Sequence, residues 1–253
     1  PVENSHLNPD EVARYARHIV LAEIGGAGQQ RLKAARVLVI GAGGLGSPVL
    51  SYLAAAGIGL LGVIDDDHVS LSNLQRQILH DTDTVGMAKT ESAARALKRL
   101  NPHTRVVTHE MRLIADNAVD ILTSYDMVVD GSDSFETRYL LADTCEVLKI
   151  PLVTAAVGRF DGSITVLTPY ETGADGKLCP RYLDLFPEAP PPGLVPSCAE
   201  AGVIGALTGV IGTLQAMEVI KLITLAGEPL VGRLLLYDGL AASFRTVRYG
   251  RKG

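Results

Sequence analysis

The stretch RVLVIGAGGLGSPVLSYLAAAG, residues 36–57, decides the fold class of this chain. Its opening run, residues 36–40, ends in four apolar residues, which is typical of a strand buried on both faces of a parallel sheet. GAGGLG, residues 41–46, follows as a complete G-x-G-x-x-G and leads into an apolar helix over about 46–56. Glycines between a strand and a helix permit a tight turn and let the backbone approach a phosphate. The stretch therefore predicts a nucleotide site, but it does not choose between NAD, FAD and ATP.

The segments around this stretch alternate between strand and helix patterns. Short apolar runs predict strands, and longer segments with a helical period predict helices between them. The predicted strands cover residues 36–40, 60–64, 105–109, 127–130 and 152–156. The predicted helices cover residues 46–56, 85–100, 116–123 and 135–149. This order predicts an α/β fold with a doubly wound, Rossmann-like, mostly parallel sheet.

Both ends of the chain depart from the alternation. Helices are expected from Asn8 or Asp10 to about Glu23 and over 27–35, and their low apolar content places them outside the main core. Further along, the sequence predicts an antiparallel C-terminal extension of the sheet. Its strands are expected within 161–169, 230–239 and 242–250, with an apolar helix over 203–225. The stretch 170–198 lacks a clear period, and long loops of that kind are usually functional or disordered.

Composition and charge disfavour several classes of protein. The net charge of −5 argues against non-specific binding to nucleic acid, which needs a basic surface. Three cysteines without a C-x-x-C argue against a disulfide framework and fit a reducing, cytoplasmic setting. The uncharged run Ala201–Met217 has 17 residues, whereas a membrane span needs about 20. A buried or subunit-interface helix is therefore predicted there, and no membrane contact is expected.

The residues after the second predicted strand favour ATP over a dinucleotide. Asp65, at the end of that strand, stands where a carboxylate binds ribose hydroxyls. Asn73, Arg76 and Gln77 follow close together, and Lys89 lies downstream at the start of a helix. An ATP site without a P-loop lysine needs cations for the phosphates, and Arg76 with Lys89 can supply them.

A pair of carboxylates follows the fourth predicted strand in the sequence DGSD, residues 130–133. Loops at the carboxyl ends of parallel strands hold the ligand in folds of this class. A carboxylate there can hold Mg²⁺, which prefers carboxylate and phosphate oxygens. Asp133 lies further into the loop and is the better candidate, whereas Asp130 can equally be a cap or a turn former.

Several motifs in a fixed order now give a specific resemblance that covers residues 8–248. They are RYAR (14–17), GAGGLG (41–46), Asp65-x-Asp67, SNLQRQ (72–77), Lys89, Asp130-x-x-Asp133 and PSCAEAG (196–202). With these residues the chain resembles the MoeB/ThiF/HesA family, the bacterial relatives of ubiquitin-activating enzymes. The resemblance implies an ATP- and Mg²⁺-dependent adenylyltransferase that acts on the C-terminal Gly-Gly carboxylate of a ubiquitin-like sulfur carrier and releases pyrophosphate. The carrier would be the small subunit of molybdopterin synthase or the thiamine-pathway carrier, with the first favoured.

The resemblance also implies a role for each matching residue. Asp65 would hold the ribose, Asp133 would hold Mg²⁺, and Asn73, Arg76 and Lys89 would contact phosphates. No general base is required, because a carboxylate is already ionised at neutral pH. The residues expected to contact the nucleotide are Gly41, Gly43, Gly44, Leu45, Gly46, Asp65, Asp67, Asn73, Arg76, Gln77, Lys89 and Asp133.

Two further residues are implied to act with partners. Arg17 would reach the γ-phosphate in the other subunit of a homodimer, and Arg14 is a weaker second candidate. Cys198 matches a cysteine that some family members use to accept the activated acyl group, but it can equally be a small buried loop residue. Cys145 is expected in the core, and Cys179 is expected to be incidental. Sulfur is expected from a separate donor protein.

The sequence departs from the family at a structural zinc site. Many relatives carry a C-x-x-C in the long loop and a second pair at the C-terminus. Here Arg181 and Asp184 stand at the first two positions, Cys179 is out of register, and the chain ends without a second pair. No zinc is therefore expected, and the loop is expected to lack its usual tether.

The expected organisation is one adenylyltransferase domain over 1–253. Within it, residues 1–35 form N-terminal helices, 36–157 a nucleotide-binding half, and 158–253 a carrier-binding half with the long loop 170–198. Two alternatives stay open at this point. An NAD(P)-dependent oxidoreductase explains the glycines and Asp65 but gives the downstream cations no purpose. A nucleotide-sensing scaffold would bind a carrier without turnover.

Overall fold

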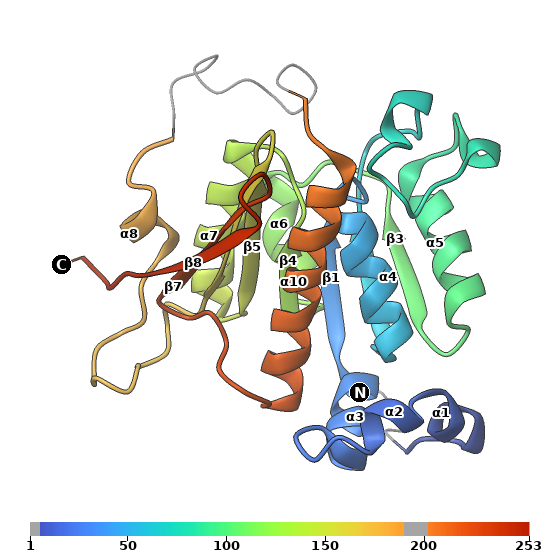
Figure 1. The fold of residues 1–253 in the computed structure, drawn as a ribbon, viewed down its shortest axis with the longest axis horizontal. Helices are drawn as coiled ribbons and strands as arrows, with labels where there is room; N and C mark the ends of the chain where they lie inside the picture. Colours follow the sequence, from blue (N-terminus) through green and yellow to red (C-terminus); the bar gives the residue numbers. More distant parts are fainter. Residues whose placement is uncertain (1–5, 190–201, 253) are drawn as a thin grey trace.

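An eight-stranded sheet forms the centre of the molecule (Figure 1). The computed structural model describes residues 6–189 and 202–252. The strand order is β3-β2-β1-β4-β5-β6-β7-β8; the first five strands are mutually parallel and the last three join them antiparallel. This confirms the predicted fold: a doubly wound, mostly parallel sheet with an antiparallel C-terminal extension.

The strands and helices follow the predicted alternation closely. The strands are β1 (Arg36–Ile40), β2 (Leu60–Ile64), β3 (Arg105–His109), β4 (Met127–Asp130), β5 (Leu152–Val157), β6 (Asp161–Leu167), β7 (Arg233–Asp238) and β8 (Ser243–Arg248). The helices are α1 (Pro9–Arg14), α2 (Ala16–Ile19), α3 (Gly25–Ala34), α4 (Gly46–Ala56), α5 (Lys89–Leu100), α6 (Ala115–Leu122), α7 (Phe135–Leu148), α8 (Tyr182–Leu185) and α10 (Gly205–Thr224). Short 3-10 turns lie at Leu71–Asn73 and Thr82–Thr84.

The sheet separates two hydrophobic cores. Val37 and Val39 of β1 face one core, which α3, α4, α5 and α10 cover, while Leu38 and Ile40 face the other, under α6 and α7. All four side chains are buried, because successive residues of a strand point to opposite faces. The continuous apolar run in the sequence is thus the consequence of a strand covered on both sides.

The long apolar helix α10 lies in one of these cores. By length and hydropathy it could cross a membrane, yet it packs against α4, β5 and β6 and buries Leu207, Ile211 and Val219 completely or nearly so. A Cβ at Gly212 would stand 2.5 Å from Pro48 Cγ, so only glycine allows α10 and α4 to approach this closely. The prediction of a buried helix is correct for this face of α10.

The N-terminal helices differ from the prediction in two ways. The first helix is interrupted at Tyr15, whose buried hydroxyl accepts a hydrogen bond from Asn101 Nδ2 at 2.7 Å. The expectation that both segments lie outside the core is wrong for α3, because Leu32 is fully buried among the core residues.

Two other boundaries also differ. Helix α5 begins at Lys89 rather than near Val85, since Gly86 adopts a positive φ of 88° and its amide donates to Val69 O. The described part of the long loop, up to residue 189, is not structureless, because it contains α8 and a bridge between Thr172 and Leu178.

Candidate nucleotide-binding site

A cavity of about 1240 Å³ opens at the carboxyl ends of the parallel strands. The loops after β1, β2 and β4 form one part of its wall, and residues of β6, β7 and β8 form another. The predicted site residues that line it are Gly41, Gly43, Gly44, Leu45, Asp65, Asp67, Arg76, Gln77, Lys89 and Asp133. Loops far apart in the sequence therefore meet where α/β folds of this kind bind ligands.

The glycine loop turns sharply between β1 and α4. Gly41 has a φ of 88°, a conformation that favours glycine, and its amide donates to Ile64 O at 2.8 Å. Gly46 is buried and does not line the cavity. A Cβ there would overlap the Gly41 carbonyl, so its glycine is needed for the close packing of the turn on the helix. Gly43, Gly44 and Leu45, which directly precede α4, line the cavity at the positive end of the helix dipole.

Asp65 ties the second strand to this loop. Its Oδ2 accepts from the Ala42 amide at 2.8 Å, and its Oδ1 accepts from the Asp67 amide at 2.9 Å. Burial raises the pKa of the Asp65 carboxyl, against the opposing effect of Lys89 and the two amides. Each carboxylate oxygen can accept more than one hydrogen bond, so acceptor capacity remains for a ligand hydroxyl.

Lys89 is the buried cation of the site. Its side chain is 7% exposed, and its Nζ lies 2.8 Å from Asp67 Oδ2. An ammonium has three N–H donors, and the pairing with Asp67 uses only one of them. Lys89 can therefore contact an anion in the cavity while Asp67 holds it in place.

The segment before α5 supplies further polar groups. Arg76 is half-buried, and its Nη1 donates to Ser72 O at 3.2 Å, which leaves most of its guanidinium donors for a ligand. Gln77 is buried, lines the cavity, and its Oε1 has no hydrogen-bond partner among the described residues. Asn73 lies in a 3-10 turn and does not line the cavity, although its carbonyl accepts from the Arg76 and Gln77 amides.

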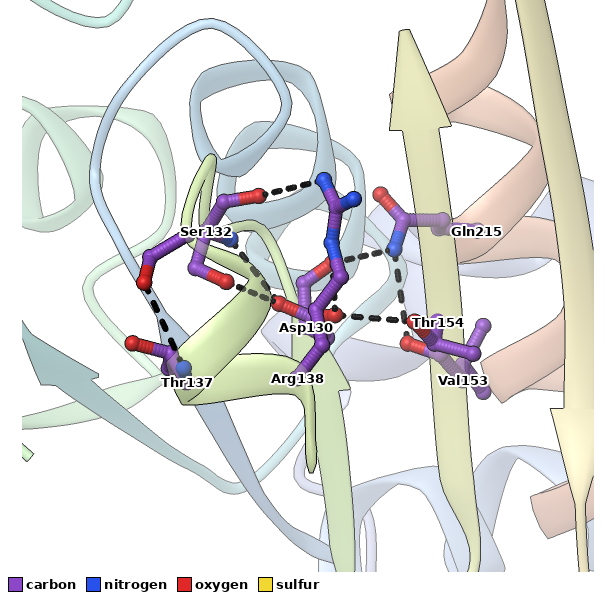
Figure 2. Close-up of polar contacts among 8 residues, drawn as sticks. Asp130, Ser132, Thr137, Arg138, Val153, Thr154 and Gln215 are labelled. Carbon is purple, nitrogen blue, oxygen red and sulfur yellow. Dashed lines mark hydrogen bonds and ion pairs between the residues drawn. The ribbon is translucent and has the colours of Figure 1, made fainter. Parts of the chain in front are cut away.

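The loop after β4 distinguishes its two carboxylates (Figure 2). Asp130 is fully buried; its Oδ1 accepts from Ser132 N at 3.0 Å and Ser132 Oγ at 2.6 Å, and its Oδ2 accepts from Thr154 Oγ1 at 2.8 Å. Asp133 is exposed and lines the cavity. Asp130 is therefore the turn-forming residue, and Asp133 is the carboxylate that can reach a ligand.

Arg138 and Gln215, which the sequence analysis missed, hold the same loop from α7 and α10. Arg138 Nη2 donates to Ser132 O at 3.1 Å, and its Nε lies 3.7 Å from Asp130 Oδ2. Gln215 Nε2 donates to Asp130 O at 2.7 Å. Figure 2 shows these side chains converging on the loop from different elements. The i, i+8 spacing of Asp130 and Arg138 is no local motif, so the fold was needed to find the pair.

These residues fit an ATP molecule with Mg²⁺. The glycine loop, at the positive end of the α4 dipole, and the cations Arg76 and Lys89 suit phosphates. Gln77 Oε1 is unpartnered among the described residues and can accept a hydrogen bond from a ligand. Asp133 has an oxygen ligand of the kind that Mg²⁺ prefers. Carboxylate oxygens of Asp65, Asp66 and Asp67 also lie within 4.8 Å of one another, but Asp65 accepts from two amides and Asp67 is paired with Lys89.

Arg17 lies far from this cavity in the same chain. It is exposed on α2, and the neighbouring Tyr15 contacts the carboxyl ends of α4 and α5, near Gly57 and Asn101. The glycine loop is at the opposite, amino end of α4, as Figure 1 makes visible. The weaker candidate Arg14 donates to Leu100 O at the same remote edge. Neither arginine lines the cavity of its own chain.

The cysteines do not contribute to the described part of the site. Cys198 lies outside the described residues. Cys145 is buried in the core, as predicted, and burial raises the pKa of its thiol to about 12. Cys179 is also buried, and burial raises its pKa. Both thiols are protonated at neutral pH and lie outside the cavity, so neither is a nucleophile for a ligand there.

The positions that correspond to the zinc site hold a polar tether instead. Asp184 is buried, and its carboxylate accepts from the amides of Arg181 at 2.7 Å and Lys252 at 2.9 Å. Arg251 Nη1 donates to the carbonyls of Pro169 and Cys179. One carboxylate and two arginines do not fit a tetrahedral zinc site. The described part of the loop is nevertheless tethered in another way, because these hydrogen bonds join it to Arg251 and Lys252.

Comparisons with known proteins agree with this arrangement. The model of the ThiF family matches residues 15–253. "Sulfur carrier protein adenylyltransferase" of Thermus thermophilus is 51% identical over 241 residues, which are 94% of this chain and 88% of that protein. "Probable adenylyltransferase/sulfurtransferase MoeZ" of Mycobacterium tuberculosis is 50% identical over 243 residues, 96% of this chain and 61% of that protein. The chain thus spans less than two thirds of the length of MoeZ.

Similarity to solved structures supports the fold. The crystal structure of E. coli MccB with MccA-N7isoASN matches with a TM-score of 0.82 at 24% identity, over 94% of this chain and 72% of that one. That likeness confirms the Rossmann-type architecture with its antiparallel extension. The comparisons give no support to the oxidoreductase alternative. Sequence motifs, cavity and relatives agree, and this chain belongs to the ThiF family.

Proposed function

We propose that the chain is an adenylyltransferase that activates the C-terminal Gly-Gly carboxylate of a ubiquitin-like sulfur carrier. The observation that supports this most is the meeting of the glycine loop, Lys89, Arg76 and Asp133 at one cavity. A dinucleotide oxidoreductase would account for the glycine loop and, in an NADP enzyme, for one cation after β2, but not for a second, buried cation and a free carboxylate. A relative with half of its residues identical is named a sulfur carrier protein adenylyltransferase.

The cavity has room for both reactants. ATP would occupy the part bordered by the glycine-loop residues Gly41–Leu45 and by Asp65, within the nucleotide-binding half, residues 36–157. The carrier tail would approach along the other part, within the carrier-binding half, residues 158–253. Ser163, Leu236, Tyr237 and Arg245 line this second part. An extended tail that ends in glycines can pass between such side chains because it carries no bulk of its own.

The reaction forms one bond and breaks another at the α-phosphate. A carboxylate oxygen of the carrier attacks the α-phosphorus, the bond to the bridging oxygen of the β-phosphate breaks, and pyrophosphate leaves with that electron pair. The product is a carrier acyl-adenylate. Lys89 and Arg76 reduce the repulsion between the two anions and stabilise the charge that develops on pyrophosphate. Backbone amides of the glycine loop would hold phosphate oxygens in position.

Asp133 is proposed to hold Mg²⁺ at the phosphates. When bound, the ion would neutralise phosphate oxygens and orient them for in-line attack. The chain contributes the carboxylate at a fixed position, because Asp130, Arg138 and Gln215 clamp the loop that carries it.

A homodimer is proposed to complete the site. Arg17 cannot reach the cavity of its own chain, so a contribution to the γ-phosphate requires Arg17 of a second copy. Val20 and Leu21, close to Arg17 in the sequence, are 73% and 47% exposed, and such apolar exposure favours a subunit contact. The Arg17 guanidinium would enter the neighbouring cavity from outside, as an arginine finger does.

The proposed carrier is the small subunit of molybdopterin synthase, with the thiamine-pathway carrier as the other candidate. Sulfur is proposed to come from a separate donor protein. Two roles are proposed for Cys198, that of an acyl acceptor and that of a plain loop residue.

Carrier-dependent ATP–pyrophosphate exchange tests the proposal. Each carrier of the source organism is assayed with Mg²⁺, ATP and labelled pyrophosphate, and a carrier lacking its last two glycines is the control. We expect label in ATP with one intact carrier and none with the truncated one. Absence of exchange with every carrier would overturn the proposal; tight NAD binding would then favour the oxidoreductase, and carrier binding without turnover the scaffold.

A further inference from the structure

One peptide unit of the glycine loop is held from both sides. The Ala42 amide donates to Asp65 Oδ2 at 2.8 Å, and the Ala42 carbonyl lies 2.8 Å from His80 Nε2. His80 is 6% exposed and does not line the cavity. Its second ring nitrogen, Nδ1, lies 2.8 Å from Ser92 Oγ. Both nitrogens of this buried imidazole are therefore engaged.

The partners determine which nitrogen carries the proton. A carbonyl oxygen can only accept, so the proton is on His80 Nε2 and is donated to Ala42. Burial lowers the pKa of the imidazole, and Lys89 acts in the same direction, against the hydrogen bond to Ala42 and the charges of Asp65 and Asp81. The ring is consequently neutral, and Nδ1 accepts from the Ser92 hydroxyl. A directed chain of two hydrogen bonds runs from Ser92 through His80 to the glycine loop.

This chain joins two elements that carry phosphate-binding groups. Ala42 lies between Gly41 and Gly43, which line the cavity. Ser92 lies in the first turn of α5, which begins at Lys89. The imidazole thus links the glycine loop to the helix that begins at Lys89.

We propose that His80 is a positioning residue for ATP: it holds the glycine loop and the amino end of α5 at the separation that the phosphates require. The inference rests on the proposed function, from which it takes ATP as the ligand. His80 itself would touch neither ATP nor the carrier. Loss of its donor would leave the buried Ala42 carbonyl unpaired and let the loop shift away from Lys89.

Two conservative variants distinguish the positioning of the glycine loop for ATP from a purely structural contribution of His80 to folding stability. In His80→Gln the amide nitrogen stands where Nε2 stood and can still donate to Ala42. In His80→Asn the shorter amide reaches only the place of Nδ1 and cannot. Both variants are neutral and polar, so a merely structural role predicts similar losses from both.

The measurement is calorimetric titration of the full chain with ATP and Mg²⁺, together with the melting temperature. We expect His80→Gln to keep the wild-type Kd within about threefold and His80→Asn to raise it about tenfold, the value of one buried hydrogen bond. In the exchange assay, His80→Asn should raise KM for ATP and leave KM for the carrier unchanged. Ser92→Ala keeps the imidazole but removes the hydroxyl that donates to Nδ1, so the proton is no longer confined to Nε2. This variant should raise the Kd about threefold.

His109 provides the matched control. Its Nε2 is 2.8 Å from Tyr125 Oη, and burial lowers its pKa as it does for His80, but it does not contact the glycine loop. His109→Asn should lower the melting temperature and leave the Kd for ATP unchanged. Equal Kd values for wild type, His80→Asn and Ser92→Ala would overturn the inference, as would equal weakening by His80→Asn and His109→Asn.

The adenylation proposal and the positioning role of His80 can be overturned independently of each other. If no carrier supports exchange but His80→Asn still weakens ATP binding, the adenylation proposal is overturned and the positioning role stands. If exchange occurs and His80→Asn binds and uses ATP as the wild type does, the adenylation proposal stands and the positioning role is overturned. If His80→Asn does not fold, the Kd of Ser92→Ala decides, and a wild-type value for that variant would overturn the inference.

Discussion

Lys89 Nζ lies 2.8 Å from Asp67 Oδ2, so the buried cation of the cavity is held by an exposed carboxylate at its edge. The lysine side chain is 7% exposed and that of the aspartate 69%. The amino end of α5 supplies the ammonium, and the loop after β2 fixes where it points. The Lys89 ammonium is therefore fixed in position and direction at the cavity.

Replacing Lys89 should remove transition-state stabilisation. We expect Lys89→Met to lower kcat/KM for ATP by about 100-fold or more, because a preorganised donor is lost from the leaving pyrophosphate. Asp67→Asn should have a smaller effect, since it frees the ammonium without removing it. Lys98→Met, an exposed lysine further along α5, is the control and should behave as the wild type. Steady-state exchange kinetics measure all three, and an active Lys89→Met would contradict the role assigned to this cation.

The two carboxylates of the loop after β4 should respond differently to substitution. Asp130→Asn should lower the free energy of unfolding by about 3 kcal/mol, because it removes the buried charge that faces Arg138. Asp133→Asn should leave stability unchanged, since its side chain is exposed, and should raise the Mg²⁺ concentration needed for exchange. Urea unfolding and Mg²⁺ titration of activity measure the two effects. The reverse pattern would mean that the metal-binding role belongs to Asp130.

Arg17 should act in the cavity of a second copy. Arg17→Ala and Arg76→Ala should each be inactive alone, since each removes a cation from every site. Mixed under conditions that allow subunits to exchange, they should regain part of the activity, because one cavity of a mixed dimer then holds Arg76 and an intact Arg17. No recovery in a mixture shown by native mass spectrometry to contain the mixed dimer would contradict action between subunits.

The tether at Asp184 should make stability depend on pH. Burial opposes ionisation, but the amides of Arg181 and Lys252 outweigh it and lower the pKa of the carboxyl. A lowered folded-state pKa stabilises the fold above the unfolded-state value, and this contribution is lost as pH falls through the folded-state pKa. Asp184→Asn should therefore cost about 2 kcal/mol at pH 7 and progressively less in acid.

Glu146→Gln is the matched control for the tether. It removes a carboxylate 3.5 Å from Arg251 in a more exposed ion pair, where the cost should stay below about 1 kcal/mol. Chemical denaturation at several pH values gives the comparison. A cost for Asp184→Asn that is independent of pH would show that the carboxylate charge does not hold the loop.

The sequence predicted those parts of the fold that depend on local pattern. β1 and the glycine loop were placed correctly, because an apolar run followed by glycines has few other structural solutions. The break at Tyr15 was missed because it depends on Asn101, 86 residues away. The start of α5 was misplaced for a similar reason, as a bridge between His68 and Ala88 replaces the expected helical turn.

The site was predictable to the extent that its residues directly follow strands. Asp65 and Asp133 stand after β2 and β4, so the topology alone brings them together. No motif or spacing in the sequence marks His80 as part of the site. Its partners Ala42 and Ser92 come close to it only in the folded chain. The tether of Asp184 to Lys252 likewise crosses 68 residues, which no local pattern reveals.

Intact mass spectrometry of the carrier, with nucleotide analysis of the same mixture, tests the central claim most directly. The chain is incubated with ATP, Mg²⁺ and the carrier that supports exchange, and the reaction is quenched in acid. Attack at the α-phosphate predicts a carrier heavier by one adenylyl group, together with one pyrophosphate per adenylate and no ADP. An unmodified carrier alongside ADP and phosphate would contradict it, because the bond to the γ-phosphate would then be the one that breaks.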